Sequence, residues 1–159
     1  MTHVRIPQGS QAIVRQPESQ IGWEAREPVL VVIEDATLLS EALDSICECL
    51  GIEVERISSY DDLVRTLRVR RPMAVVAEMD AAGQDGCHVL ITVAEYDRQL
   101  PVLMITGDDP ALLGAIDAVE EMWDVQAVVK WPRLRGVGEI VKFLFHAGHS
   151  GNCLRLMPV

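Results

Sequence analysis

The sequence has no long apolar stretch. No run approaches the roughly 20 residues that a membrane-spanning helix needs. The opening residues, MTHVRIP, contain no apolar core and no cleavage signal, so secretion is not expected. With hydrophobic residues at 49% and charged residues at 24%, the composition is ordinary for a globular protein. We therefore expect a cytoplasmic protein that does not contact membranes.

Basic residues and cysteine motifs are also scarce. Lys and Arg number 14 against 24 Asp and Glu, so the net charge is −10. This balance argues against sequence-independent binding to nucleic acid, which relies on neutralising phosphates. The four cysteines form no Cys-x-x-Cys pair and match no standard zinc spacing. We expect reduced thiols and no zinc centre.

The sequence divides into an arm, one domain and a tail. Residues 1–27 are rich in Gln, Pro and Ser and show no sustained period, which is typical of an arm. Residues 28–147 alternate between apolar runs and helical patterns and are long enough for one core. Residues 148–159 form a short C-terminal tail.

Four apolar runs and one alternating segment within the domain predict strands, and five segments of helical periodicity follow them in turn. Gly51 marks the end of the first helix, and Asp109 is a candidate N-cap ahead of Pro110. The expected strands are residues 29–33, 52–57, 73–77, 101–105 and 125–129. The expected helices cover residues 39–50, 60–67, 89–94, 110–119 and 137–145.

Strands that alternate with helices predict an α/β fold with a doubly wound, five-stranded parallel sheet covered by helices on both faces. The expected strand order is 2-1-3-4-5, the flavodoxin-like order, with a ligand crevice at the carboxyl ends of the first and third strands. Polar residues collect there. They are Glu34 and Asp35 after the first strand, Glu78 and Asp80 at the third, Thr106 at the fourth and Lys130 at the fifth.

Such a set suits magnesium-dependent phosphoryl transfer, since carboxylates hold the cation while Lys and Thr contact phosphoryl oxygens. Residues 29–145 resemble the receiver domain of bacterial response regulators. The resemblance is carried by Val-Val-Ile-Glu34-Asp35, by Pro-Met-Ala-Val-Val-Ala-Glu78, by Pro-Val-Leu-Met-Ile-Thr106 and by Ala-Val-Val-Lys130. It implies an acidic metal-binding pair, a phosphoacceptor position at residue 78, a switch hydroxyl and a site lysine.

The sequence departs from the family pattern at the residues that matter most. Glu78 replaces the acceptor aspartate, and Ala127 stands at the position of the aromatic switch. Trp131 separates Lys130 from Pro132, where the family has Lys followed directly by Pro. We therefore expect no conventional phosphorylation at residue 78.

Two interpretations of Glu78 remain open at this stage. Its carboxylate reaches about one methylene further than that of Asp, so it could imitate a phosphorylated aspartate by pairing with Lys130 and Thr106. Alternatively, it is an inert carboxylate that Lys130 neutralises. Both interpretations predict a Glu78–Lys130 ion pair. A displaced acceptor such as Asp80 is a third option, and it would make the chain a phosphorylatable receiver.

The leading expectation is a stand-alone receiver, not an enzyme, that acts in two-component signalling through protein–protein contact. Its partner would be a histidine kinase, another regulator or an effector. A cofactor-binding flavodoxin-like protein is disfavoured, because acidic residues replace a Gly-rich phosphate loop after the first strand. Magnesium is expected to bind weakly or not at all. A homodimer is expected through the face of the fourth helix, fifth strand and fifth helix, where Trp123 and Trp131 are interface candidates.

Overall fold

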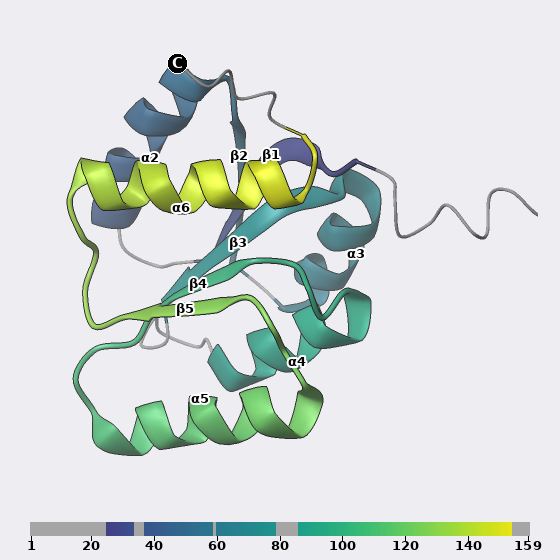
Figure 1. Cartoon of the computed structure of the whole chain (residues 1–159), viewed down its shortest axis with the longest axis vertical. Helices are drawn as coiled ribbons and strands as arrows, with labels where there is room; N and C mark the ends of the chain where they lie inside the picture. The colour runs from purple at the N-terminus through teal and green to yellow at the C-terminus, as the bar shows by residue number, and fades with distance from the viewer. Residues whose placement is uncertain (1–24, 34–36, 59, 79–85, 154–159) are drawn as a thin grey trace, which may run out of the picture.

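The protein is a three-layer α/β structure in which a parallel sheet lies between two layers of helices (Figure 1). This computed structural model describes residues 25–33, 37–58, 60–78 and 86–153. The expected elements are all present. The strands are β1 (Glu27–Ile33), β2 (Glu53–Ile57), β3 (Pro72–Glu78), β4 (Val102–Ile105) and β5 (Val128–Trp131). The helices are α2 (Thr37–Leu50), α3 (Tyr60–Arg70), α4 (Gly86–Tyr96), α5 (Pro110–Trp123) and α6 (Val137–Ser150).

The sheet has the order β2-β1-β3-β4-β5, and all of its pairings are parallel. The predicted 2-1-3-4-5 topology is therefore confirmed. Helices α2 and α6 cover one face, and α3, α4 and α5 cover the other (Figure 1). Strand β5 is an edge strand, as is β2. Within the described residues, no helix is both long and apolar enough to cross a bilayer.

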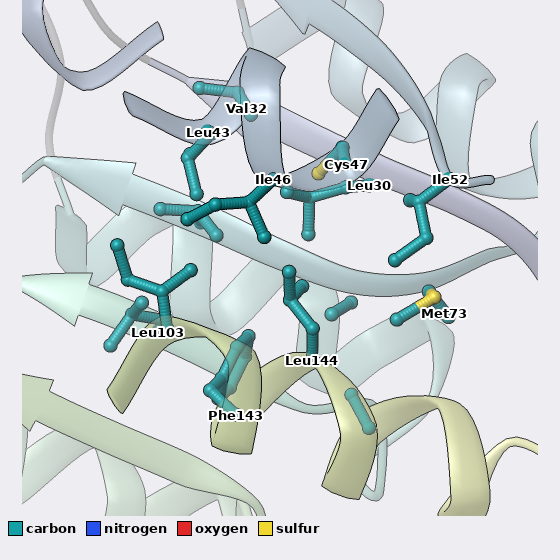
Figure 2. Close-up of a cluster of buried hydrophobic side chains, with 14 of the residues drawn as sticks. Leu30, Val32, Leu43, Ile46, Cys47, Ile52, Met73, Leu103, Phe143 and Leu144 are labelled. Carbon is teal, nitrogen blue, oxygen red and sulfur yellow. The ribbon is translucent and has the colours of Figure 1, made fainter. Parts of the chain in front are cut away.

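Each face of the sheet has its own hydrophobic core, because side chains along a strand point alternately to opposite faces. Figure 2 shows the first core, where Leu30, Val32 and Leu103 from the strands meet Leu43 of α2 and Leu144 of α6. The second core joins the remaining strand residues to α3, α4 and α5. It contains Val31, Ile33, Val75, Ala77, Met104, Leu63, Leu90 and Ile116.

Local signals in the sequence account for several element boundaries. Helix α5 begins after Asp109, whose side chain accepts a hydrogen bond of 2.9 Å from the backbone amide of Ala111. Helix α2 ends before Gly51, whose φ of +73° is readily adopted only by glycine. The predicted cap of α5 and stop of α2 are thus confirmed.

The fifth strand differs from the prediction. Residues 125–129 were expected to form it, but β5 runs from Val128 to Trp131. Asp124 ends α5 in the left-handed conformation, with φ of +54°, and the Gln126 amide then donates to the carbonyl of Arg98. The chain therefore enters the sheet three residues later than its apolar run suggests. This shift changes which residues lie at the carboxyl edge, the edge of the sheet at which the strands end.

Candidate functional site at the carboxyl edge of the sheet

The carboxyl edge holds only part of the predicted site. Glu78 is the last residue of β3, and Thr106 directly follows β4. Both lie at this edge, as the sequence predicts. The predicted acidic residues Glu34, Asp35 and Asp80 lie outside the described residues. Within the described part of the chain, no group of three or more His, Cys, Asp or Glu side chains is arranged to hold a metal.

Lys130 lies away from this edge and faces the helical layer that contains α5. Its pairing partner in β4 is Met104, which belongs to the core beneath α3, α4 and α5. The ammonium Nζ lies 2.8 Å from Asp117 Oδ1 and 2.6 Å from Glu120 Oε2, both on α5. The predicted Glu78–Lys130 ion pair is therefore not formed. The reason is the register of β5, which turns this side chain to the opposite face from Glu78.

The electrostatics of Lys130 agree with this geometry. Partial burial lowers the pKa of its ammonium, but hydrogen bonds and charge from Asp117 and Glu120 more than offset burial. The net effect raises the pKa of Lys130 above its ordinary value. The carboxylates of α5 therefore hold Lys130 in its charged form, on the face of the sheet that α5 covers and away from the predicted phosphoryl site.

Trp131 occupies the level of the sheet at which the resemblance predicts a lysine. It pairs with Ile105, and Ile105 pairs with Glu78, so Trp131 and Glu78 are level with each other. Trp131 also directly precedes Pro132, as the site lysine does in the family pattern. The side chain is 4% exposed and belongs to the core beneath α2 and α6. Trp131 is thus a core residue in this chain and offers little exposed surface to the interface predicted for it.

A cation does accompany Trp131, but it comes from the loop after β5. The Arg135 guanidinium lies 5.1 Å from the centroid of the indole ring, a cation–π geometry. Arg135 also lies 3.8 Å from Glu139 in the first turn of α6. Nothing in the sequence pattern pointed to this pair.

Thr106, the predicted switch residue, is fully buried, and its hydroxyl is used by the backbone. The hydroxyl donates to the carbonyl of Gly107 at 2.9 Å and lies 3.4 Å from the carbonyl of Trp131. The Thr106 amide donates to the same Trp131 carbonyl at 2.8 Å. These contacts fix the residue between β4 and β5 and turn the hydroxyl toward the main chain.

The other two predicted site residues lie elsewhere. Ala127 precedes β5, and its carbonyl accepts from the amide of Val102, so it lies level with the start of β4. Trp123 is the last residue of α5 and is half-buried. Sequence reasoning missed Asp117 and Glu120 as partners of Lys130. The signal available was their spacing, because residues three apart share one face of a helix.

Comparison with known proteins shows the receiver fold. No protein-family model matches the sequence, and no curated protein matches it. Several solved structures do. A CheY-like receiver domain protein from Methanospirillum hungatei JF-1 is 12% identical with a TM-score of 0.63, and the match covers 80% of this chain and 98% of that one. The beryllofluoride-activated NtrC4 receiver domain dimer is 14% identical with a TM-score of 0.62, covering 78% and 98%.

A multidomain regulator matches as well. NtrX from Brucella abortus is 17% identical with a TM-score of 0.60, and the match covers 78% of this chain. This chain spans only 27% of the length of that NtrX chain. At these identities the comparisons establish that this chain has the receiver fold.

Proposed function

We propose that this chain is an atypical response-regulator receiver that acts in two-component signalling by protein–protein contact, without phosphorylation at residue 78 and without enzymatic activity. The observation that carries the proposal is the position of Lys130, whose ammonium is bound by two carboxylates of α5. A phosphoryl group at the carboxyl edge would lack this lysine, the cation that the family pattern provides to stabilise its charge. The Thr106 hydroxyl, turned to the backbone, supports the same conclusion.

The geometry also bears on the two interpretations of Glu78. The phosphomimetic interpretation requires Glu78 to pair with Lys130, and the Lys130 ammonium instead contacts Asp117 and Glu120 of α5. We therefore propose that Glu78 prevents phosphorylation and does not imitate it. Replacement of Glu78 by Gln keeps the shape and removes the charge. Partner binding, measured by calorimetry once a partner is in hand, should be unchanged in Glu78→Gln, whereas a phosphomimetic role requires a clear loss.

The phosphorylation claim itself is tested with a small phosphodonor and magnesium, followed by intact mass measurement of the full chain. We expect no gain of a phosphoryl group under conditions that label a conventional receiver. Labelling of Asp80, located by peptide mass spectrometry, would instead establish the phosphorylatable alternative. Labelling of residue 78 would overturn the proposal.

We also propose that the partner includes a second copy of this chain, seated on the face built from α5, β5 and α6. This face carries four exposed large apolar side chains, namely Met122, Val129, Val137 and Phe145. It also includes the edge strand β5. The NtrC4 receiver, which has the same fold, forms a dimer when activated. Apolar surface that gathers at one face in this way is typical of an interface.

Charge supports a two-fold arrangement of these copies. Helix α5 contains three acidic residues, Asp117, Glu120 and Glu121, and no basic one, whereas Lys142 lies on α6 and Arg135 just before it. A two-fold axis parallel to β5 would place α5 of each copy against α6 of the other. The acidic α5 of one copy would then face Arg135 and Lys142 of the other, whose two positive charges outnumber the one negative charge of Glu139, on both sides of the axis.

Sedimentation velocity of the full chain tests this interface. Phe145→Asp should shift the protein to a monomer, because it replaces an exposed apolar side chain of the face with a charge. Val69→Asp is the control, since Val69 is also an exposed apolar residue but lies on α3, on the other side of the sheet. Equal behaviour of the two variants would contradict the proposed face.

A further inference from the structure

Helix α5 has unusually little apolar anchorage in this fold. Ile116 is its one fully buried residue, whereas α4 buries six residues and α6 buries five. The backbone of α5 lies chiefly against α4. Two partly buried residues, Leu112 and Val119, join Ile116 in packing against the core beneath α3, α4 and α5. This burial is smaller than that of α4 or α6, so the position of α5 relative to β5 needs a further source of stability.

The Lys130 contacts supply that source. Asp117 and Glu120 are three residues apart on α5, so they lie on one face of the helix and would repel each other without a cation between them. The ammonium contacts both at 2.8 and 2.6 Å. The Lys130 and Glu120 side chains are 30% and 23% exposed, so this pair is better shielded from solvent than the other described lysine pair, Lys142–Glu139.

We infer that Lys130 is the positioning residue of the α5–β5–α6 face, because its ammonium fixes α5 against the edge strand independently of events at the carboxyl edge. The same lysine that the family pattern would assign to the phosphoryl site thus holds the surface through which we propose that partners bind. This inference rests on the proposed function for its biological meaning. The helix should keep one position whether or not a phosphoryl analogue is added.

Hydrogen exchange of the full chain, read by mass spectrometry for each element, tests the inference. In Lys130→Met we expect exchange across residues 110–123 to rise roughly five-fold, with α4 and β1 unchanged. Arg65→Met, which removes an exposed ion pair with Asp62 on α3, should leave α5 unchanged. Lys130→Arg should restore wild-type exchange, because its guanidinium also contacts paired carboxylates. Self-association should weaken in Lys130→Met only.

The outcomes separate this inference from the proposed function. Unchanged exchange of α5 in Lys130→Met would overturn the inference, and so would an equal rise in every element, which indicates general destabilisation. Exchange of wild-type α5 is also measured with magnesium and beryllofluoride, a phosphoryl analogue. If adding them slowed the exchange of α5, the position of α5 would depend on the carboxyl edge, and that part of the inference would be wrong. Phosphodonor labelling of residue 78 would contradict the proposed function. The comparison of α5 exchange between wild type and Lys130→Met would still be valid, because it uses unlabelled protein.

Discussion

Trp131 and Glu78 lie at the same level of the sheet, joined through Ile105 between them. Lys130 precedes Trp131 by one position and therefore faces the opposite helical layer, where it contacts Glu120. One position along β5 thus decides whether a cation or an indole ring stands level with the residue at the phosphoacceptor position. In this chain the Trp131 indole lies at that level, and the Lys130 ammonium contacts the carboxylates of α5.

Cys47 and Cys49 should differ sharply in thiol chemistry. Burial, with a smaller contribution from Asp44, raises the pKa of Cys47 to about 11, whereas Cys49 is exposed. Since the thiolate is the reactive form, a thiol reagent at pH 8 should modify Cys49 in the folded protein and leave Cys47 unmodified. Peptide mass spectrometry checks this, with Cys49→Ser as the control. Rapid modification of Cys47 without denaturant would show that the core beneath α2 is more open than described.

The Cys47 thiol should also make stability fall at alkaline pH. Its folded pKa lies above the unfolded value of 9.0, so the unfolded chain loses this proton first as the pH rises. The contribution is fully present below pH 9 and is lost between about pH 9 and 11, at up to roughly 3 kcal/mol. Urea unfolding of wild type and Cys47→Ala across this window measures it. The variant should show the shallower decline, whatever its absolute stability, and parallel curves would refute the assignment.

Gly151→Ala should loosen the junction between the residues before β1 and the end of α6. The Arg26 amide donates to the Gly151 carbonyl at 2.9 Å, and the Arg26 guanidinium lies 2.8 Å from Asp97. A Cβ at residue 151 would meet Arg26 Cδ at 3.0 Å, so the arginine would have to move. We expect a loss of about 1 kcal/mol by chemical denaturation.

Two further variants test whether the contact with Arg26 causes this loss of stability. Gly138→Ala lies in the same helix, has nothing within 4 Å of the added Cβ, and should be neutral or stabilising. In an Arg26→Ala background, Gly151→Ala should cost less, because the contact with Arg26 Cδ is gone, while those with the Cβ of residue 26 and with the Ala147 carbonyl, both at 3.3 Å, remain. An equal cost with and without Arg26 would rule out the contact as the cause.

Magnesium should bind this protein weakly. The acidic residues expected from the sequence, Glu34 and Asp35, would have to coordinate the ion beside a glutamate that is longer than the usual aspartate, and no phosphoryl oxygen would complete the shell. Calorimetric titration of the full chain should give little heat at micromolar concentrations. Dissociation in the low micromolar range or below would revive the phosphorylatable alternative.

The fold was predictable because each element has a strong local signal. The apolar runs of β1 and β3 stand out in the sequence, and the Asp109-Pro110 pair marks the start of α5. Periodicity and alternation of strands with helices then determine the class and the sheet order.

The site was less predictable because it depends on register. Residues 125–131 form one nearly continuous apolar run, so the pattern does not show which residue enters the sheet first. Entry at Val128 follows from the left-handed Asp124 and the Gln126–Arg98 hydrogen bond, which are properties of the folded chain. A shift of strand register by one residue moves each side chain to the opposite face of the sheet. This is why Lys130 contacts α5 and does not lie at the carboxyl edge.

The most direct test of the central claim is phosphodonor labelling of Glu78→Asp beside the wild type, with magnesium present and a conventional receiver as positive control. The variant restores the usual acceptor but leaves Lys130 on α5 and Trp131 level with residue 78. We predict that intact mass measurement shows no phosphoryl group on either protein. Stable labelling of Asp at position 78 would contradict the account, because it would show that this edge stabilises a phosphoryl group without the lysine.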